Sequence, residues 1–471
     1  MRQLPSHRAS VPAAPGRSSA RQQSARTYDA RVREKPMGLG LFLLAALWII
    51  LLFDPHWYLA AKGISVALEL PVLLFGSLLI AIGLGVPTNE AWSRRWQWYA
   101  PFLMYIGIGV VTVPFAQNIG YARDATQGLL LWWALIVGTA VMVDSVRRAE
   151  MLIVLYGVQF LWWALWGAST GQVIWHHSLS NFDGFGSFNV GGLAICYFLG
   201  VASPKAWLKW LMYTTAGLCA LGVVASFARG AFLAAVLLFV IILARSPHKG
   251  KTLLAGAGGA LIMVVAASLL FDDGFFWAEI MSSFSEGTSE GTGEDRWILW
   301  SAAWRVFLER PILGAGPRNW GPLASVLFQP GELKSMYANP GALYDMSLHN
   351  LYMTTLSELG AVGIGALAWI LIDFWKRNAA LRTEAAQQRW RELGGRLQLR
   401  PIAFGLEGAM VAFLANAALY SMMGIHWFFT MLAVNVLLHA LVVRNKPPRP
   451  GRRQRGRVLA PGPAVPGPRP T

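Results

Sequence analysis

The chain has few charged residues and almost no cysteine. Charged side chains make up 14% of its 471 residues, hydrophobic side chains make up 55%, and only two residues are cysteine. A soluble protein of this size carries about 25% charged residues and would have to bury a dozen separate apolar runs. A bilayer core of about 30 Å accepts one run of about 20 apolar residues per crossing, so the composition predicts a membrane protein.

The sequence also lacks the patterns of metal and nucleotide sites. Cys196 and Cys219 both fall inside apolar runs, where a small side chain packs well, so we expect neither a disulfide bond nor a metal site. No glycine-rich loop ends in Gly-Lys-Ser or Gly-Lys-Thr, and no spaced pair of aspartates indicates a nucleotide-sugar site. We therefore expect no cofactor, and any activated donor would have to be something other than a soluble nucleotide sugar.

The net charge of +16 is concentrated in three segments. Residues 1–36 hold 8 basic and 2 acidic side chains, residues 375–401 hold 7 and 2, and residues 443–471 hold 8 and none. Basic residues beside apolar spans are typical of cytoplasmic loops rather than of a groove that reads nucleic-acid phosphates. We therefore expect no nucleic-acid partner, a cytoplasmic loop over 375–401, and two disordered basic tails in the cytoplasm.

Hydropathy predicts an all-α polytopic membrane protein of about twelve transmembrane helices, with an uncleaved first span. The expected spans are 37–53, 63–86, 98–115, 125–143, 150–167, 188–203, 206–226, 230–245, 253–271, 351–374, 402–421 and 425–442. Spans 1–9 thus fill residues 37–271, and spans 10–12 fill residues 351–442. Alternate loops carry the basic residues, which satisfies the positive-inside rule throughout.

This threading leaves one long loop, residues 272–350, on the outer face. It contains 10 acidic and 5 basic side chains, and loops of this length are usually functional or disordered. Trp297, Trp300, Trp304 and Phe307 recur at helical spacing. A stripe of this kind can lie on the membrane surface or pack inside the protein, and we expect packing.

Three arginines on the outer face are candidate ligands of a diphosphate, because a leaving diphosphate gains charge when a bond to it breaks. Arginine suits this role through its fixed fork of N–H groups. Arg229 lies at an outward turn between two spans, Arg296 opens a helix-like stretch, and Arg318 follows a glycine-rich turn. The structural alternatives are, in turn, an arginine that reaches lipid phosphate, an ion pair with neighbouring acids, and an exposed loop arginine.

His349 stands in Ser347-Leu-His-Asn350, where the long outer loop re-enters the membrane. Neutral imidazole accepts a proton near pH 7, so His349 is a candidate for activating an acceptor hydroxyl. Asn350 would hold the histidine or a sugar. The alternative for His349 is a hydrogen-bonded anchor without a chemical role.

At these residues the sequence resembles the O-antigen ligase and polymerase family. The matching motifs are Ser226-Phe-Ala-Arg-Gly-Ala231, Arg296 with Trp300, Pro311-Ile-Leu-Gly314 with Gly316, His349-Asn350, and Glu358-Leu-Gly360 with Gly363. Phe185-Gly186 with Asn189 is similar to the family's Gly-Asn-rich start of a span, whereas Ala228 stands where the family often has a hydroxyl residue. The motifs cover about residues 180–370, and the number of expected spans fits the remainder.

The resemblance implies a metal-independent glycosyltransferase of the bacterial inner membrane, with its active site on the periplasmic face. Its partners would be an undecaprenyl-diphosphate-linked glycan as donor, a lipid or glycan as acceptor, and the membrane lipids. By the same resemblance, Arg229, Arg296 and Arg318 bind the donor diphosphate and His349 activates the acceptor. Asn350, Glu358 and Asn189 are the supporting residues.

Several activities fit this reading. The acceptor is lipid A core for a ligase, another lipid-linked glycan for a polymerase, and a Ser or Thr side chain for a protein O-oligosaccharyltransferase. The third is disfavoured because no long soluble domain follows the last expected span. A transporter or flippase is the alternative from another class, and Glu69 and Glu407 inside expected spans favour it. The long outer loop and the lack of an internal repeat disfavour it.

Overall fold

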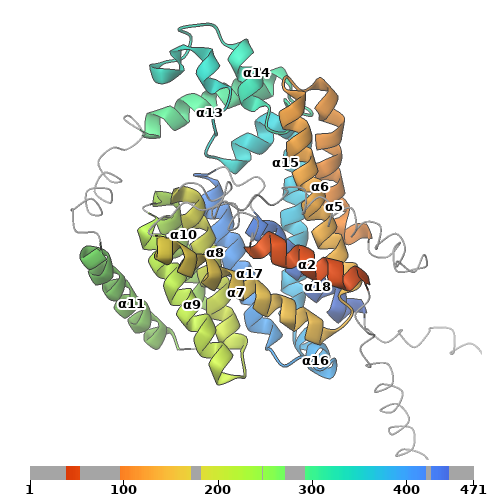
Figure 1. Cartoon of the computed structure of the whole chain (residues 1–471), viewed down its shortest axis with the longest axis vertical. Coiled ribbons are helices and arrows are strands. Elements are labelled where there is room, and N and C mark those ends of the chain that lie inside the picture. Colours follow the sequence, from red (N-terminus) through yellow and green to blue (C-terminus); the bar gives the residue numbers. More distant parts are fainter. Residues whose placement is uncertain are drawn as a thin grey trace, which may run out of the picture.

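The structure is a computed structural model, which describes residues 39–53, 96–170, 182–226, 228–246, 248–270, 292–420 and 426–444. Every regular element in these ranges is a helix, which confirms the predicted all-α class. Most of the helices form a bundle, and a smaller group of helices covers one end of it (Figure 1).

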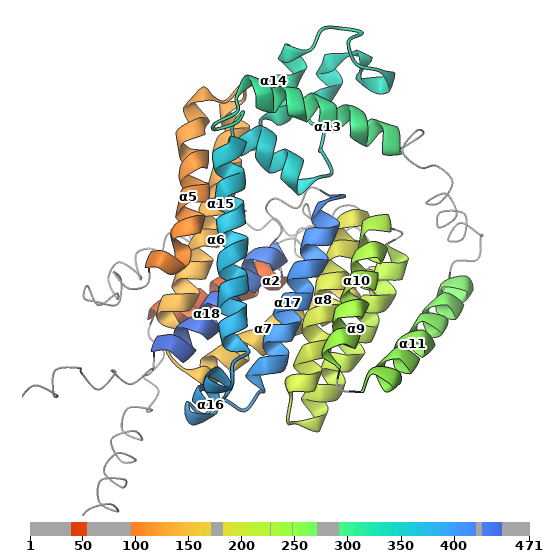
Figure 2. The same ribbon diagram turned by 180° about the vertical axis from the view of Figure 1, so that it is seen from behind.

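The bundle contains α2 (Leu39–Phe53), α5 (Trp96–Thr112), α6 (Ile119–Met142), α7 (Val146–Thr170), α8 (Phe182–Ala202), α9 (Ala206–Ala225), α10 (Arg229–Arg245), α11 (Lys249–Leu270), α15 (Leu351–Leu381), α17 (Leu399–Ala417) and α18 (His426–Arg444). The smaller group comprises α13 (Thr292–Glu309), α14 (Trp320–Leu327) and the 3₁₀ helices Ser335–Ala338 and Pro340–Leu343. The short helix α16 (Glu384–Glu392) lies at the opposite end of the bundle (Figure 2).

A helix occupies each expected span that falls within the described residues, whereas the expected span 63–86 lies outside them. Three of the helices searched are long and apolar enough to cross a membrane: Phe185–Ala202, Ala206–Ala225 and Leu351–Leu381. Shorter apolar helices lie at Leu41–Phe53, Ala100–Phe115, Gly230–Arg245 and Trp427–Val442. The total of about twelve spans stays a prediction.

One apolar core runs through the bundle, with α8 packed against α9, α10 and α17. Large side chains such as Phe160, Phe188 and Trp427 are fully buried in it. Cys196 and Cys219 are buried in α8 and α9, as their apolar surroundings in the sequence indicated. On the outside of α10 and α11, by contrast, many aliphatic side chains are exposed, which suits contact with lipid rather than water.

The smaller group of helices, residues 292–350, forms a folded unit that we call the outer subdomain. Its own apolar core includes Leu299 and Val306 from α13, Trp320 from α14 and Leu348 from the segment before α15. Because this part of the long loop buries a core, it is a folded element rather than a disordered connection. Residues 272–291 of the loop lie outside the described ranges.

The sequence predicts that the aromatic stripe on α13 packs inside the protein, but only part of it does. Trp300 is partly buried, and its Nε1 donates a hydrogen bond to the carbonyl oxygen of Leu348 at 2.8 Å. The prediction of packing is wrong for Trp297 and Trp304, whose exposed fractions are 56% and 48%. The buried face of α13 is instead its small aliphatic face, which carries the alanines at 302 and 303.

The predicted cytoplasmic loop 375–401 is largely helical, through the end of α15, the helix α16 and the start of α17. α15 continues to Leu381 because its last turns bind neighbouring helices. The Nδ2 of Asn378 donates to the carbonyl of Ala403 in α17 at 2.9 Å, and the Nε of Arg377 donates to the Oδ1 of Asn435 in α18 at 2.9 Å.

Glu407, an acidic residue that favoured a transporter, is held by two arginines. Its carboxylate accepts hydrogen bonds from Arg245 at 2.5 Å and from Arg382 at 2.7 Å. Both cations come from other helices, so the pair ties α10 and α15 to α17. This geometry supports the structural interpretation of Glu407, whereas Glu69 lies outside the described residues.

Candidate functional site

The turn 311–316 is joined to α15 by four backbone hydrogen bonds, and we call this arrangement the joint. The N–H groups of Ala315 and Gly316 donate to carbonyls of α15 at 2.9 and 2.8 Å. In return, the N–H groups of Ala361 and Val362 donate to carbonyls of the turn at 2.9 and 3.2 Å. A continuous α-helix would use these groups of α15 for its own hydrogen bonds, so α15 has to break here.

Two glycines make the joint possible. Gly360 has φ 66° and ψ −165° inside α15, and a Cβ there would lie 2.3 Å from the carbonyl oxygen of Ile312. Gly314 has φ 72°, and a Cβ there would lie 2.4 Å from the carbonyl oxygen of Glu358. Only glycine accepts both the positive φ and the close approach. The Pro-Ile-Leu-Gly and Glu-Leu-Gly motifs are therefore the two halves of one structural feature.

A cavity of about 340 Å³ lies beside the joint, between the outer subdomain and the ends of α6 and α15. Its lining residues are Tyr121, Ala125, Arg318, Trp320, Gly321, Pro322, Tyr344, Asp345, Met346, Ser347, Leu348, Thr354 and Glu358. The cavity therefore brings together segments that lie more than 200 positions apart in the sequence. We call it the outer cavity.

Arg318 and Glu358, both predicted from the sequence, meet in the outer cavity. The guanidinium carbon of Arg318 lies 4.6 Å from the ring centroid of Tyr121, an arrangement that keeps its N–H groups available to a ligand. The carboxyl group of Glu358 is buried and accepts hydrogen bonds from the backbone N–H groups of Arg318 and Trp320. Glu358 thus holds the segment that carries Arg318.

Further polar residues around the cavity were missed by sequence reasoning. The hydroxyl of Tyr121 donates to Asp345 at 2.8 Å. The backbone N–H of Asn118 donates to the Oδ1 of Asn319 at 2.6 Å, and the Nδ2 of Asn319 donates to the carbonyl of Asn118 at 3.0 Å. These contacts fix the turn between α5 and α6 to the outer subdomain. No local pattern signals them, because each pair is more than 200 residues apart.

His349 and Asn350 lie at the edge of the outer cavity. Ser347 and Leu348 line the cavity, whereas the side chain of His349 is not among the described residues that do. The ring of His349 is half-buried, 6.1 Å from the ring of Tyr420. The Oδ1 of Asn350 caps α15 by accepting the N–H of Met353 at 2.9 Å, so Asn350 fixes the start of the helix directly after the histidine.

Arg318 and His349 share a strained backbone. Their φ angles are 56° and 48°, and within the described ranges they are the two non-glycine residues with positive φ. Such a conformation costs about 1–3 kcal/mol and persists where the surroundings enforce it, often at functional sites. Arg318 and His349, which we selected from the sequence for their chemistry, are thus the two residues that the fold holds at an unfavourable positive φ.

Arg229 lies at the same end of the bundle, as the first residue of α10. The next residue, Gly230, packs against α17 so closely that a Cβ would lie 2.6 Å from the Oδ1 of Asn416. Two residues further along, the carbonyl of Ala418 accepts a hydrogen bond from the Nδ2 of Asn350 at 3.0 Å. The starts of α10 and α15 therefore meet around the outer end of α17.

The other two predicted residues do not line the outer cavity in the described part of the chain. Asn189 is buried within α8, where its Nδ2 donates to the carbonyl of Phe185 at 2.9 Å and its side chain lies against Gly222 of α9. Arg296 is half-buried near the start of α13, as its fifth residue. The geometry thus gives Asn189 a packing role and leaves Arg296 outside the cavity wall.

No group of three or more His, Cys, Asp or Glu side chains is placed to hold a metal ion in the ranges that the structure describes. The polar groups at the outer cavity are instead one guanidinium, two carboxyl groups, tyrosine and serine hydroxyls and backbone N–H groups. Such a set can bind an anion and hydrogen-bond sugar hydroxyls.

Comparison with known proteins supports the resemblance that the motifs predicted. Residues 214–368 match the model of a protein family described as O-antigen ligase. No match was found among curated proteins. The matched residues include the start of α10, the outer subdomain, the joint and the lining of the outer cavity other than its α6 residues. Residues 214–368, which hold most of the candidate site, are therefore similar to the O-antigen ligase family.

Proposed function

We propose that this protein transfers a glycan from a polyprenyl diphosphate to an acceptor hydroxyl at the outer cavity, on the periplasmic face of the bacterial inner membrane. The observation that carries the proposal is that Arg318 lines the outer cavity and that His349, the other described non-glycine residue with positive φ, directly follows the lining residues Ser347 and Leu348. A ligase- or polymerase-type activity is what the family match implies. The donor, the acceptor and the orientation are our proposal.

The donor diphosphate would bind at Arg318. The α14 helix begins at Trp320, two residues after Arg318, and α15 begins at Leu351, directly after Asn350. The positive ends of both helix dipoles lie near the cavity and favour an anion there. These interactions strengthen as the leaving diphosphate gains charge, which is the condition for catalysis. Arg229 and Arg296 are proposed as additional donor contacts on positional grounds.

The acceptor would be activated by His349. Its imidazole takes the proton of the acceptor hydroxyl while that oxygen bonds to the first carbon of the donor sugar. The bond from this carbon to the phosphate oxygen breaks, and the diphosphate leaves with the electron pair. Asp345, with its partner Tyr121, provides polar groups for sugar hydroxyls beside this reaction. Asn350 and Glu358 position the histidine and the arginine, respectively.

The lipid part of the donor needs a path along the membrane. Trp297, Trp304 and Leu308 of α13 lie on one side of the helix at 56%, 48% and 58% exposure. Exposed tryptophans are typical of the level of the lipid headgroups. A subdomain resting on the outer leaflet through this face would keep the cavity close to the diphosphate of a polyprenyl donor.

The test is glycan transfer by the purified protein in lipid vesicles. The assay supplies an undecaprenyl-diphosphate-linked glycan together with lipid A core, or with a second lipid-linked glycan, and detects the new glycosidic bond. We expect Arg318→Ala to lower the rate about 10²- to 10³-fold, as loss of one charge-stabilising donor does. The matched control is Arg305→Ala, because Arg305 lies in the same subdomain but pairs with Glu332.

The same assay separates the two classes of function. A transporter or flippase would move the lipid-linked glycan across the vesicle membrane without forming a glycosidic bond, which would refute the proposal. Product with lipid A core alone would identify a ligase, and product with a second lipid-linked glycan would identify a polymerase. The family match is consistent with either product.

A further inference from the structure

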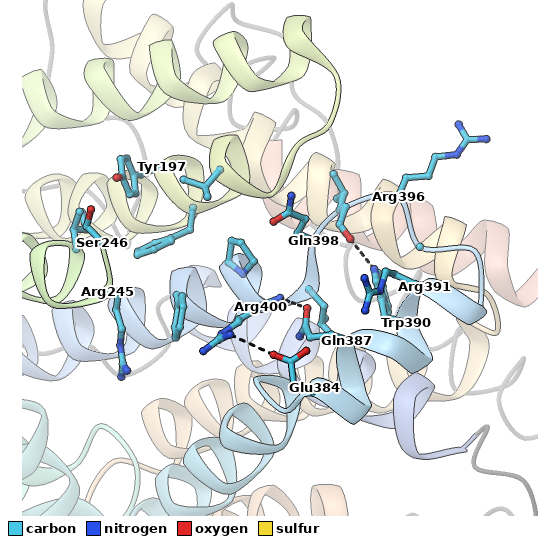
Figure 3. A pocket seen from close by; sticks show the side chains of 18 residues that line it. Tyr197, Arg245, Ser246, Glu384, Gln387, Trp390, Arg391, Arg396, Gln398 and Arg400 are labelled. Atoms are coloured by element: carbon cyan, nitrogen blue, oxygen red, sulfur yellow. Dashed lines mark hydrogen bonds and ion pairs between the residues drawn. The ribbon is translucent and has the colours of Figure 1, made fainter. Parts of the chain in front are cut away.

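A second cavity, of about 590 Å³, lies at the end of the bundle opposite to the outer subdomain. It is enclosed by the ends of α8 and α10 on one side and by α16 and the start of α17 on the other (Figure 3). We call it the basal cavity. The transfer reaction proposed above does not use it.

One wall of the basal cavity is apolar and continues the surface of the bundle. It includes Phe198 and Val201 of α8, Ile242 of α10 and Phe404 of α17. Val201 is 37% exposed, so this wall reaches the surface of the protein. A hydrocarbon chain can lie against such a surface without uncovering any polar backbone group.

The rim of the basal cavity is strongly cationic. Arg245, Arg391, Arg396 and Arg400 line it, and Glu384 is the one acidic side chain among its described lining residues. Glu384 lies 3.5 Å from Arg400, across an exposed ion pair that contributes little. Arg245 is already paired with Glu407, so the cavity presents the guanidinium groups of Arg391, Arg396 and Arg400 with Glu384 as the one lining carboxylate.

The arginines are oriented by an aromatic ring on the apolar wall. The guanidinium carbons of Arg245 and Arg400 lie 5.0 and 5.9 Å from the ring centroid of Phe404. Contact with a ring leaves the N–H groups of a guanidinium available for hydrogen bonds, although Arg245 uses one of them to bind Glu407. The cationic rim and the apolar wall thus meet at Phe404. A lipid bound here would place its headgroup on one side of this ring and its acyl chain on the other.

We propose that the basal cavity binds the phosphodiester headgroup of an anionic membrane lipid, with an acyl chain along the wall of Phe198 and Val201. Basic pockets between membrane helices suit such headgroups, and guanidinium forks bind phosphate oxygens in pairs. The expected orientation puts this end in the cytoplasm. The site is separate from the outer cavity, so lipid binding holds whether or not the proposed transfer takes place.

The test measures lipid retention by native mass spectrometry after reconstitution of the full chain into nanodiscs. One preparation contains phosphatidylcholine alone, and the other contains phosphatidylcholine with one-fifth phosphatidylglycerol. We expect bound phosphatidylglycerol on the wild-type chain. The double variant Arg391→Gln/Arg400→Gln should bind it about 25-fold more weakly, at about fivefold for each arginine near an anionic lipid.

The matched control is Arg389→Gln, since Arg389 lies on α16 but pairs with Glu392 outside the cavity. This variant should retain the lipid. A second variant, Val201→Trp, narrows the apolar wall without changing the charge, and it should also displace the lipid. Equal retention by the wild-type chain and the double variant would overturn the proposal.

A soluble competitor distinguishes the source of the phosphate. Inorganic phosphate at millimolar concentration should leave the bound lipid in place, because it cannot use the apolar wall. If inorganic phosphate binds in its stead and Val201→Trp has no effect, the site takes a free phosphate and the lipid proposal fails. Glycan transfer, measured on the same samples, reports separately on the outer cavity.

Discussion

The backbone of Gly360 lies against the carbonyl oxygen of Ile312, so close that a Cβ at position 360 would be 2.3 Å from that oxygen. The contact is part of the joint, where α15 is interrupted and the turn 311–316 supplies the hydrogen-bonding groups that the helix gives up. Arg318 lies two residues after this turn. The break in α15 therefore determines the position of Arg318, the residue proposed to bind the diphosphate, relative to the helix bundle.

Replacing Gly360 tests this relationship. Gly360→Ala should lower the free energy of unfolding by at least about 2 kcal/mol, because alanine fits neither the backbone angles nor the space. The measurement is the thermal midpoint of the purified protein in detergent. Gly365→Ala is the control on the same helix, since a Cβ there meets nothing within 4 Å. Equal midpoints for the two variants would show that the joint is not strained as described.

Removing the imidazole of His349 should abolish the reaction but not donor binding. General acid–base catalysis contributes about 10²- to 10⁴-fold, so His349→Ala should reduce transfer by that factor. Binding of the lipid-linked donor, measured on the same protein, should stay within about twofold of the wild-type value because Arg318 is intact. His248→Ala, at the opposite end of α10, should change neither quantity. Unchanged transfer by His349→Ala would rule out its catalytic role.

The helices were predictable because a lipid environment leaves an apolar segment few alternatives to a helix. Two of the candidate site residues were proposed from their neighbours in the sequence. Arg318 follows a glycine-rich turn, and His349 stands where the long loop meets the next expected span. Local sequence patterns do not predict contacts between residues that are far apart in the chain. Tyr121 and Asp345 meet across 224 positions, and nothing near either residue indicates the other.

The error on α13 has a physical origin too. Two faces of this helix are apolar, one with tryptophans and one with leucine, alanine and valine. Helical periodicity identifies both faces but does not say which is buried. The fold buries the face of Leu299, Ala302 and Val306, because small side chains allow the rest of the outer subdomain to approach closely.

Glu407 should matter for stability and not for chemistry. Glu407→Gln leaves Arg245 and Arg382 without their carboxylate, at a site where the Glu407 side chain is 11% exposed and the arginines are 37% and 25% exposed. After allowing for solvent screening, we expect a loss of about 1–2 kcal/mol in the free energy of unfolding. Transfer per folded molecule should be unchanged. A loss of substrate movement with normal stability would favour the transporter instead.

The outer subdomain should lose stability in acid through Glu332. Hydrogen bonds from the Gln329 backbone and from Arg305 hold the pKa of this carboxyl below its ordinary value. A lowered pKa stabilises the fold above the unfolded-state pKa of about 4.3, and the contribution is lost as the pH falls below it. Thermal unfolding between pH 3 and 7 should therefore be less pH-dependent in Glu332→Gln than in the wild type. Identical pH profiles would show that Glu332 does not contribute.

The proposed function requires that the outer cavity faces away from the cytoplasm. Both native cysteines are buried, so a single introduced cysteine can report its side of the membrane. We would place one at Met336, which is 57% exposed in the outer subdomain, and another at Gln388, which is exposed on α16. Both variants are treated with a membrane-impermeant maleimide in intact spheroplasts.

Met336→Cys should be labelled without permeabilisation, and Gln388→Cys should be labelled only after it. The reverse pattern would put the outer cavity in the cytoplasm, out of reach of an exported lipid-linked glycan, and would contradict the proposed function.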